Sequence, residues 1–372
     1  MHIGIDVRNL TGGSVTGIAR VLIESARVLD ERGARLSFFW PGRRQASPLD
    51  TFTTARHVES VFPQAGGAVA WQFTGLPLAA RRARPDVFWG PAHRLPAFMP
   101  RTIPLVVTIH DLVWHRQPQT MTLRRRLADA GLMRLAVLRA DKVLADSDAT
   151  ARDIGAILGR QDAETLYPGV TQMTGTPRAD VLARHGLARG GYALFVGTVE
   201  PRKNLVRLLD AFTRSRAAAR ADWTLALAGG QGWKDEAIRA RLAPLISAGH
   251  VRVLGYVSDS DLAALYAHAR FLAMPSLYEG FGLPVIEAQQ HGTPVLVSTA
   301  GSLPEIAGAG GLAVDPFDEQ QLGLALARLF SDDTLRAGLS SAAHANARRF
   351  DWQAYGDRLT AIFETLARTH PR

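Results

Sequence analysis

The sequence predicts an α/β protein built from two Rossmann-like domains. Three observations carry this prediction. Short apolar runs alternate with stretches of helical periodicity, a pattern typical of parallel sheets whose strands are joined by helical crossovers. The alternation forms two series, which are separated by polar and turn-forming residues at 171–180. The length of 372 residues fits two domains of ordinary size.

The first series opens with a strand and an amphipathic helix. Residues 2–7 (HIGIDV) predict the strand, and residues 16–30 predict the helix because their apolar side chains fall on one face. Residues 104–110 (PLVVTIH) are almost continuously apolar, which is typical of a parallel strand buried on both faces. Further strands are expected at 36–40, 86–90 and 142–147, with a basic helix at 122–139.

The second series repeats the alternation after the linker. Strands are expected at 192–197, 223–230, 251–256, 270–275 and 294–298, with helices at 205–218, 235–249 and 261–269. We therefore expect one domain at residues 1–170 and a second at 171–351.

Composition excludes several classes of protein. The chain has no cysteine, so it has neither disulfides nor thiolate metal ligands. No apolar stretch is long enough to span a bilayer, and the first residues lack the basic and apolar regions of a signal peptide, so we expect a cytoplasmic protein. The net charge of +9 would suit nucleic acid, but no DNA-binding motif or RNA-stacking pattern accompanies it, and no nucleic-acid partner is expected.

The strongest chemical pattern lies at residues 276–298. A strand ends near Pro275, and a glycine-containing loop leads into a helix that Pro284 suits as a first residue and Gly292 as a C-terminal cap. Such a loop points backbone N–H groups and a helix N-terminus at one spot, which favours an anion. Two carboxylates, Glu279 and Glu287, flank the loop. An ordinary turn with solvated glutamates is the alternative interpretation.

A family resemblance rests on two motifs. Glu279 and Glu287, with seven residues between them that include GFGLP, resemble the signature of retaining GT-B glycosyltransferases of family four. The segment 197–204 (GTVEPRKN) is similar to the family motif in which an arginine and a lysine bind the donor diphosphate. The resemblance implies the GT-B fold, with two Rossmann-like domains facing across a cleft. It also implies an acceptor-binding first domain, a donor-binding second domain, and a C-terminal helix at about 352–372 that packs back on the first domain.

The resemblance also implies roles for single residues. Arg202, Lys203 and the backbone amides of residues 280–283 would stabilise the leaving diphosphate in place of a metal. Glu279 would face the transferred sugar, and Glu287 would hold the ribose of the donor. Counting all positions, the expected catalytic residues are Glu279, Arg202, Lys203 and His110, and the expected donor-binding residues are Gly280, Phe281, Gly282, Leu283, Glu287, Tyr256 and Gly17.

Each weaker match keeps a structural alternative. Arg202 and Lys203 could be a solvated pair at a helix start, although Lys203 is one of only three lysines in the chain. His110 ends a buried strand and could be a core histidine with satisfied hydrogen bonds. Gly17 closes the glycine-rich segment 12–17, which could form a plain turn.

The expected activity is that of a retaining, metal-independent hexosyltransferase without a cofactor. The motifs look most like those of bacterial mannosyltransferases of O-antigen and exopolysaccharide synthesis, so a GDP-linked donor sugar is favoured. A UDP-sugar donor and a GT-B sugar-nucleotide epimerase are the alternatives. The acceptor is expected to be a lipid-linked glycan, and the protein could be peripheral at the inner face of the cytoplasmic membrane.

Charge distribution motivates the membrane expectation. Residues 1–170 hold 22 Lys and Arg against 15 Asp and Glu, whereas residues 171–372 hold 21 against 19. The basic stretches 81–84 and 124–126 could therefore meet an anionic membrane surface. An ordinary solvated arginine-rich surface is the alternative.

Overall fold

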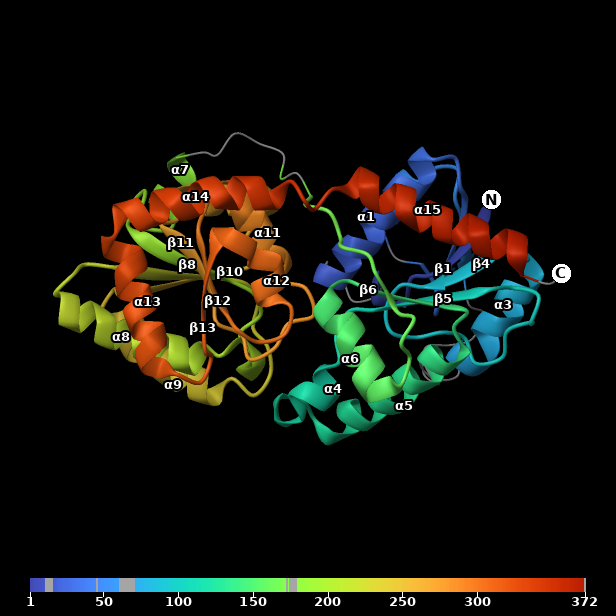
Figure 1. Ribbon diagram of the computed structural model, residues 1–372, viewed down its shortest axis with the longest axis horizontal. Helices are drawn as coiled ribbons and strands as arrows, with labels where there is room; N and C mark the ends of the chain where they lie inside the picture. Colours follow the sequence, from blue (N-terminus) through green and yellow to red (C-terminus); the bar gives the residue numbers. More distant parts are fainter. Residues whose placement is uncertain (11–15, 45, 60–70, 172, 174–178, 371–372) are drawn as a thin grey trace. The chain divides into compact units, whose positions relative to one another are not determined.

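The computed structural model describes residues 1–10, 16–44, 46–59, 71–171, 173 and 179–370. The chain folds into two compact units, each built on its own parallel sheet (Figure 1). The predicted α/β class with two Rossmann-like domains is confirmed. Unit 1 comprises Met1–Trp114, Leu123–Gly169 and Asp351–Arg372, and unit 2 comprises His115–Thr122 and Val170–Phe350.

Within the described residues, the sheet of unit 1 has seven parallel strands in the order β3-β2-β1-β4-β5-β6-β7. Every residue of β1 and β5 is buried, as expected for strands covered on both faces. The strands are β1 (His2–Asp6), β2 (Arg35–Trp40), β3 (Arg56–Glu59), β4 (Val87–Gly90), β5 (Leu105–Ile109), β6 (Lys142–Ala145) and β7 (Glu164–Thr165). The helices are α1 (Gly17–Glu31), α3 (Leu76–Ala83), α4 (Val113–Arg116), α5 (Leu123–Arg139), α6 (Asp148–Leu158) and α15 (Trp352–Thr369).

The described part of unit 2 contains six parallel strands in the order β10-β9-β8-β11-β12-β13. Its core gathers apolar side chains from strands and flanking helices, among them Phe195, Leu209, Phe212 and Phe330. The strands are β8 (Tyr192–Val196), β9 (Thr224–Ala228), β10 (Val251–Gly255), β11 (Phe271–Met274), β12 (Val295–Ser298) and β13 (Gly311–Val314). The helices are α7 (Ala179–Arg184), α8 (Leu205–Ala219), α9 (Glu236–Ser247), α10 (Asp259–His268), α11 (Leu283–Gln290), α12 (Leu303–Ala307), α13 (Glu319–Ser331) and α14 (Asp333–Ala347).

The last helix, α15, belongs to unit 1 and packs against α1. Ser25 Oγ donates to Tyr355 Oη at 3.0 Å, and Arg32 Nη2 lies 2.6 Å from Asp357 Oδ1. Figure 1 shows α1 and α15 together on one face of the sheet, with α5 and α6 on the other. Residues 371–372 of the expected C-terminal helix, and most of the expected linker, lie outside the described residues.

One segment departs from the expected division of the chain near residue 170. Residues 115–122, between β5 and α5, group with unit 2. The reason is a set of hydrogen bonds from the loop after β9. Trp233 Nε1 donates to the Thr120 carbonyl at 2.9 Å, and Lys234 Nζ donates to the Gln119 and Met121 carbonyls at 3.1 Å each.

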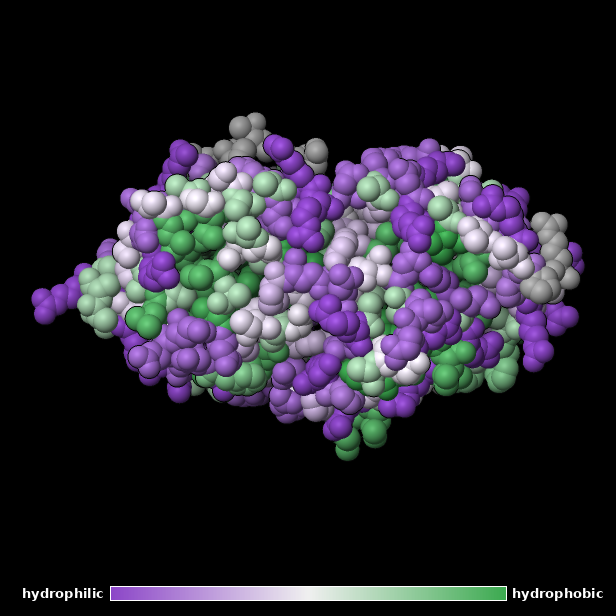
Figure 2. Space-filling model, viewed as in Figure 1, coloured by the Kyte–Doolittle hydropathy of each residue, from purple (hydrophilic) through white to green (hydrophobic). Residues whose placement is uncertain are grey.

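Hydrophilic side chains are spread over the visible face of each unit, with smaller hydrophobic areas between them (Figure 2). In the part of the chain that the structure describes, no helix combines the length and the apolar composition needed to cross a bilayer.

Candidate active site

A buried ion-pair cluster lies at the carboxyl ends of β8 and β11 in unit 2. Glu279 accepts a hydrogen bond from Lys203 (Nζ to Oε1, 2.7 Å) and another from Arg202 (Nη1 to Oε2, 2.6 Å). Arg202 also donates through Nη2 to Glu200 Oε1 at 2.7 Å. Glu200, Lys203 and Glu279 are all buried. The fold therefore joins the two motifs that the sequence analysis singled out, although they are far apart in the chain.

The turn after β8 explains how the two cations reach Glu279. Residues Pro201–Lys203 form a single 3₁₀ turn, and Asn204 follows in the left-handed conformation with φ of 61°. Asn204 Nδ2 donates to the carbonyls of Pro275 (3.0 Å) and Pro316 (2.8 Å), which ties the turn to the end of β11. The turn thus places Arg202 and Lys203 at the sheet edge where ligands of open α/β folds bind.

Opposing effects set the charge of Glu279. Burial raises the pKa of this carboxyl, but the positive charges of Arg202 and Lys203 outweigh it and lower the pKa to about 2. Glu279 is therefore ionised at neutral pH and, together with Glu200, balances the charges of Arg202 and Lys203. An anionic ligand at this place would compete with Glu279 for the donors of Arg202 and Lys203.

The loop after Glu279 has a backbone that glycine alone accommodates well. Gly282 has φ of 106°, and a Cβ added there would lie 2.8 Å from Leu303 Cδ2. Ser302 Oγ donates to the carbonyls of Glu279 (3.1 Å) and Phe281 (2.8 Å), which fixes the path of the loop. The loop leads directly into α11, whose N-terminal backbone amides favour an anion.

Phe281 and Leu283, two of the expected donor-binding residues in this loop, differ in how far their side chains are buried. The Phe281 ring is buried and packs edge-on against Phe350 at 5.7 Å, so Phe281 offers a ligand its backbone. Leu283, the first residue of α11, is half-buried. Gly292 follows α11 with φ of 69°, as predicted for a C-terminal cap.

The second glutamate of the signature is held by another helix. Glu287 is buried in α11, and its Oε2 accepts a hydrogen bond from Tyr266 Oη of α10 at 2.8 Å. Tyr256, in contrast, follows the edge strand β10 and exposes 80% of its side chain. Two strand spacings separate β10 from β8, so Tyr256 lies on the order of 10 Å along the sheet edge from the cluster.

The two remaining expected site residues belong to unit 1. Gly17 is the first residue of α1, after the capping residue Thr16. Residues 12–15 of the glycine-rich segment lie outside the described residues.

His110 follows β5, and both of its ring nitrogens face acceptors. Nδ1 lies 2.5 Å from Asp146 Oδ2, and Nε2 lies 2.6 Å from the Pro91 carbonyl oxygen. Two acceptors suit the doubly protonated ring. Burial lowers the pKa of His110, but the charge and hydrogen bond of Asp146, together with the Pro91 carbonyl, raise the pKa above its usual value. His110 therefore forms a buried ion pair inside unit 1.

Two glycosyltransferase family models match the chain, one in its first half and one in its second. Residues 184–346 match the model described as "Glycosyl transferases group 1", and residues 15–172 match the one described as "Glycosyltransferase Family 4". The chain belongs to the group 1 glycosyltransferases of family 4.

The chain covers different fractions of the lengths of its relatives. The chain is 41% identical over 173 residues to an O-antigen chain mannosyltransferase B of Escherichia coli, a match that covers 46% of the chain and 45% of that relative. The chain thus spans less than half of this relative's length. It is 28% identical over 395 residues to a D-inositol 3-phosphate glycosyltransferase of Salinispora arenicola, covering 96% of the chain and 79% of the relative.

A solved structure shows the same fold. Sucrose-phosphate synthase from Thermosynechococcus elongatus superposes with a TM-score of 0.80 at 19% identity, over 98% of this chain and 99% of that one. The GT-B fold expected from the resemblance is confirmed.

Sequence reasoning missed four residues that hold the expected site residues in place. Glu200 lies inside the motif at 197–204, and Ser302 follows shortly after the segment 276–298. Closeness to these motifs could have identified both residues. Asp146 follows β6 as His110 follows β5, and the two become neighbours because Ile109 pairs with Ala145, a register that the sequence does not reveal. Tyr266 carries no sequence signal, since α10 looks like an ordinary buried helix.

Proposed function

We propose that this family 4 glycosyltransferase is a retaining, metal-independent enzyme of bacterial surface polysaccharide synthesis. It transfers a hexose, mannose or a related sugar, from a nucleotide-diphosphate donor to a lipid-linked or glycan acceptor. The observation that carries the proposal is the buried cluster of Arg202, Lys203 and Glu279 beside the N-terminus of α11. Cations and helix amides bind a diphosphate, and a carboxylate beside them suits a sugar.

The chemistry of transfer assigns each charge a task. As the bond between the sugar and the diphosphate breaks, negative charge grows on the leaving group and positive charge grows on the sugar ring. Arg202, Lys203 and the amides of residues 280–283 stabilise the leaving group, which makes a metal unnecessary. The acceptor hydroxyl attacks on the side from which the diphosphate departs and gives its proton to the departing phosphate oxygen, so the new glycosidic bond keeps the configuration of the sugar.

We assign donor binding to unit 2 and acceptor binding to unit 1. Unit 2 holds the donor, with Glu287 at the ribose and the backbone near Tyr256 at the base. Unit 1 holds the acceptor, with Gly17 near the diphosphate. His110 meets the transferred sugar, for which Nε2 would exchange the Pro91 carbonyl for a sugar hydroxyl.

A GDP-linked donor is favoured because one relative is named as a mannosyltransferase. A UDP-sugar remains the alternative donor, and a sugar-nucleotide epimerase the alternative activity. Thermal unfolding and calorimetry with GDP, UDP and ADP test the donor, because the cognate nucleotide stabilises the protein most. Equal weak effects of all three nucleotides would argue against a nucleotide site.

Product analysis tests the chemistry. We expect GDP to be released only as a sugar is joined to an acceptor, with the anomeric configuration of the donor kept in the NMR spectrum of the product. EDTA should leave the rate unchanged, and restoration by Mg²⁺ of a rate lost to EDTA would contradict metal independence. A free epimerised sugar nucleotide would support the alternative activity instead.

The enzyme acts, in this proposal, at the inner face of the cytoplasmic membrane as a peripheral protein. The support is the excess of basic residues at positions 1–170, which contain 22 Lys and Arg against 15 Asp and Glu.

A further inference from the structure

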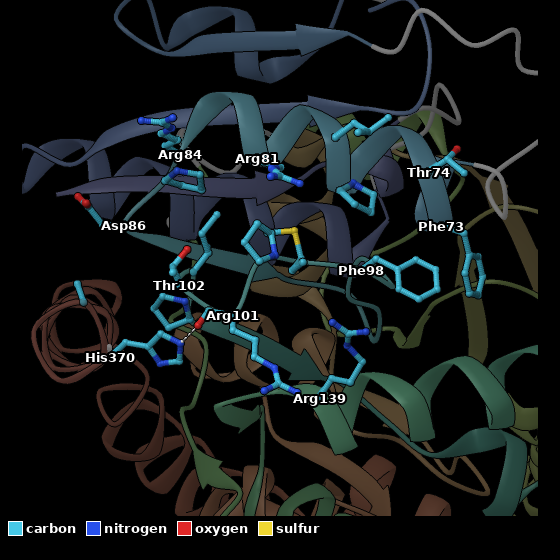
Figure 3. Close-up of a pocket in the computed structure, with 18 of the residues that line it drawn as sticks. Phe73, Thr74, Arg81, Arg84, Asp86, Phe98, Arg101, Thr102, Arg139 and His370 are labelled. Atoms are coloured by element: carbon cyan, nitrogen blue, oxygen red, sulfur yellow. Dashed lines mark hydrogen bonds between the residues drawn. The ribbon is translucent and has the colours of Figure 1, made fainter. Parts of the chain in front are cut away.

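A groove in unit 1 arises from the way β4 is connected to β5. Residues 91–104 join these strands without a helix, whereas α3 precedes β4 and α5 precedes β6. The strand order carries all three connections in the same direction across the sheet, so right-handed crossovers place them on one face. The layer of helices is therefore interrupted between α3 and α5, and a groove of about 1760 Å³ lies there (Figure 3). We call it the α3–α5 groove.

Large apolar side chains are exposed along the α3–α5 groove. Leu78 of α3 is 51% exposed, Phe98 of the β4–β5 connection 69% and Leu138 of α5 75%. Phe98 also meets Phe73 edge-on, with ring centroids 6.3 Å apart. Exposed apolar side chains gathered along one groove are typical of a surface that binds an apolar partner.

The same groove carries unpaired positive charge. Arg81, Arg84, Arg101 and Arg139 line it, and none of these side chains forms a hydrogen bond or ion pair with another described residue. Arg139 Nε is buried and has no hydrogen-bond partner among the residues that the structure describes. Asp86 is the acidic residue among the described lining residues, and its Oδ2 already accepts the backbone N–H of His2 at 2.7 Å.

Figure 3 shows that the labelled arginines reach the groove from three separate parts of the chain. Arg81 and Arg84 come from α3 and its C-terminal cap, Arg101 from the β4–β5 connection, and Arg139 from the last residue of α5. Their guanidinium groups can therefore bind phosphate oxygens from several sides.

The α3–α5 groove is distinct from the site proposed for transfer. Its residues Asp86 and Pro104 immediately precede β4 and β5, at the amino ends of these strands. His110 lies just beyond the carboxyl end of β5. The five residues of β5 separate the two ends by roughly 16 Å.

We propose that the α3–α5 groove binds anionic phospholipid of the membrane surface. The arginines bind lipid phosphates, while Leu78, Phe98 and Leu138 contact the acyl chains beneath them. Charge complementarity selects this partner, because the groove combines unpaired cations with apolar side chains as a phospholipid combines phosphate with hydrocarbon. The inference rests on the membrane association proposed above and is independent of the transfer chemistry.

Sedimentation of the full chain with lipid vesicles tests the groove. Wild-type protein should bind phosphatidylcholine vesicles that contain phosphatidylglycerol and should bind pure phosphatidylcholine only weakly. The variant Arg81→Gln/Arg84→Gln/Arg101→Gln should lose about ten- to hundredfold in partitioning to the anionic vesicles. The variant Arg124→Gln/Arg125→Gln/Arg126→Gln removes the same charge from the other basic stretch of unit 1, in α5 outside the groove, and if the groove is the membrane site it should lose less than about threefold. Equal losses of vesicle binding in both variants would show that the attraction is spread over the basic surface of unit 1. That result would contradict lipid binding in the groove.

A second variant separates apolar contact from charge. Phe98→Ala leaves the charge unchanged and should still weaken binding to anionic vesicles, whereas unaltered binding would remove the acyl contact from the proposal. Sedimentation velocity provides a further check, since a concentration-dependent dimer that Phe98→Ala dissociates would assign the groove to a second copy of the chain and overturn the lipid.

Calorimetry with GDP or UDP on the same variants keeps the two proposals apart. Thermal unfolding and circular dichroism that match wild type show that unit 1 of the groove variant is folded, and unchanged nucleotide affinity shows that the donor site of unit 2 is intact, so its loss of vesicle binding supports the groove. If the protein binds no nucleotide, a loss of vesicle binding confined to the groove variant would still support the groove while the proposed donor site failed.

Discussion

Lys203 donates through Nζ to Glu279 Oε1 at 2.7 Å, and this bond joins the two motifs that carry the proposed chemistry. Arg202 holds the other oxygen of the same carboxylate at 2.6 Å. One carboxylate thus contacts both cations that we propose for the donor diphosphate, and Glu200, which pairs with Arg202, supplies a second negative charge. The site is therefore arranged to keep its charges paired until a competing anion arrives.

Removing either cation should slow transfer. Arg202→Ala and Lys203→Ala each remove a contact that strengthens as charge develops on the leaving diphosphate. We expect each substitution to lower kcat/KM about 30- to 1000-fold, which corresponds to a loss of roughly 2–4 kcal/mol of transition-state stabilisation. Steady-state kinetics measures the loss, with Lys142→Ala as the control because Lys142 pairs with Glu164 in unit 1. Near-normal kcat in both variants would take these residues out of the mechanism.

The acid stability of the protein should depend on Glu279. Its pKa of about 2 lies below the ordinary value of 4.5, so the stabilisation from its ionised form is complete above pH 4.5 and disappears as pH falls towards 2. The contribution is on the order of 3 kcal/mol. Denaturant unfolding of wild type and Glu279→Gln should show a stability difference that is largest near pH 6 and narrows below about pH 4.

An exposed glutamate of the same unit supplies the control for this measurement. Glu236 lies in the first turn of α9 and is exposed, so Glu236→Gln should leave the pH profile of unfolding close to that of wild type. A Glu279→Gln profile parallel to that of wild type would show that the carboxylate is not held by the two cations.

Sequence patterns predicted the interior of each sheet better than its edges. Strands β1, β5 and β8 were expected because burial on two faces demands nearly continuous apolar residues. The unpredicted strands β3, β7 and β13 all lie at the edges of their sheets, where part of the strand stays accessible and the apolar signal fades. The segment 115–122 was assigned to the wrong side of the division because hydrogen bonds from Trp233 and Lys234 cannot be read from periodicity.

The candidate site was likewise predicted only in part from the sequence. The motifs containing Arg202, Lys203 and Glu279 were visible in the sequence, and the fold brings them into contact. The pairing of His110 with Asp146 was not foreseen, since it depends on the register of β5 against β6. Tyr266 reaches Glu287 only because α10 and α11 pack together, which is a tertiary property.

Asp146 should control the protonation of His110. The raised pKa of His110 means that its stabilising ion pair is complete below the ordinary pKa of 6.5 and is lost as pH rises through the higher value in the folded state. Asp146→Asn removes the opposing charge, so burial should then lower the pKa of His110. NMR titration of the imidazole protons, assigned with His110→Gln, measures the change. A His110 titration that Asp146→Asn leaves in place would contradict the ion pair.

The two glutamates of the signature should fail in different ways when they are changed. Glu287 lies in α11, and we propose that it holds ribose hydroxyls, which change little during the reaction. Its contacts therefore contribute equally to the bound donor and the transition state. Glu287→Gln should weaken nucleotide-diphosphate binding and raise the donor KM, with a smaller fall in kcat. Tyr266→Phe keeps the carboxylate but removes the hydrogen bond at 2.8 Å that orients it, so it should weaken binding in the same direction by a smaller factor.

Glu279 should show the opposite division between binding and chemistry. Glu279→Gln removes the negative charge that competes with the diphosphate for Arg202 and Lys203, so nucleotide-diphosphate affinity should be unchanged or increased. The same change removes the carboxylate that we propose offsets positive charge on the sugar ring, so kcat should fall strongly. Calorimetry with the nucleotide diphosphate and kcat measurements on the three variants decide the assignment. Loss of nucleotide affinity in Glu279→Gln, together with normal affinity in Glu287→Gln, would reverse the two assignments. Glu279, which precedes the loop, would then be the carboxylate that faces the ribose.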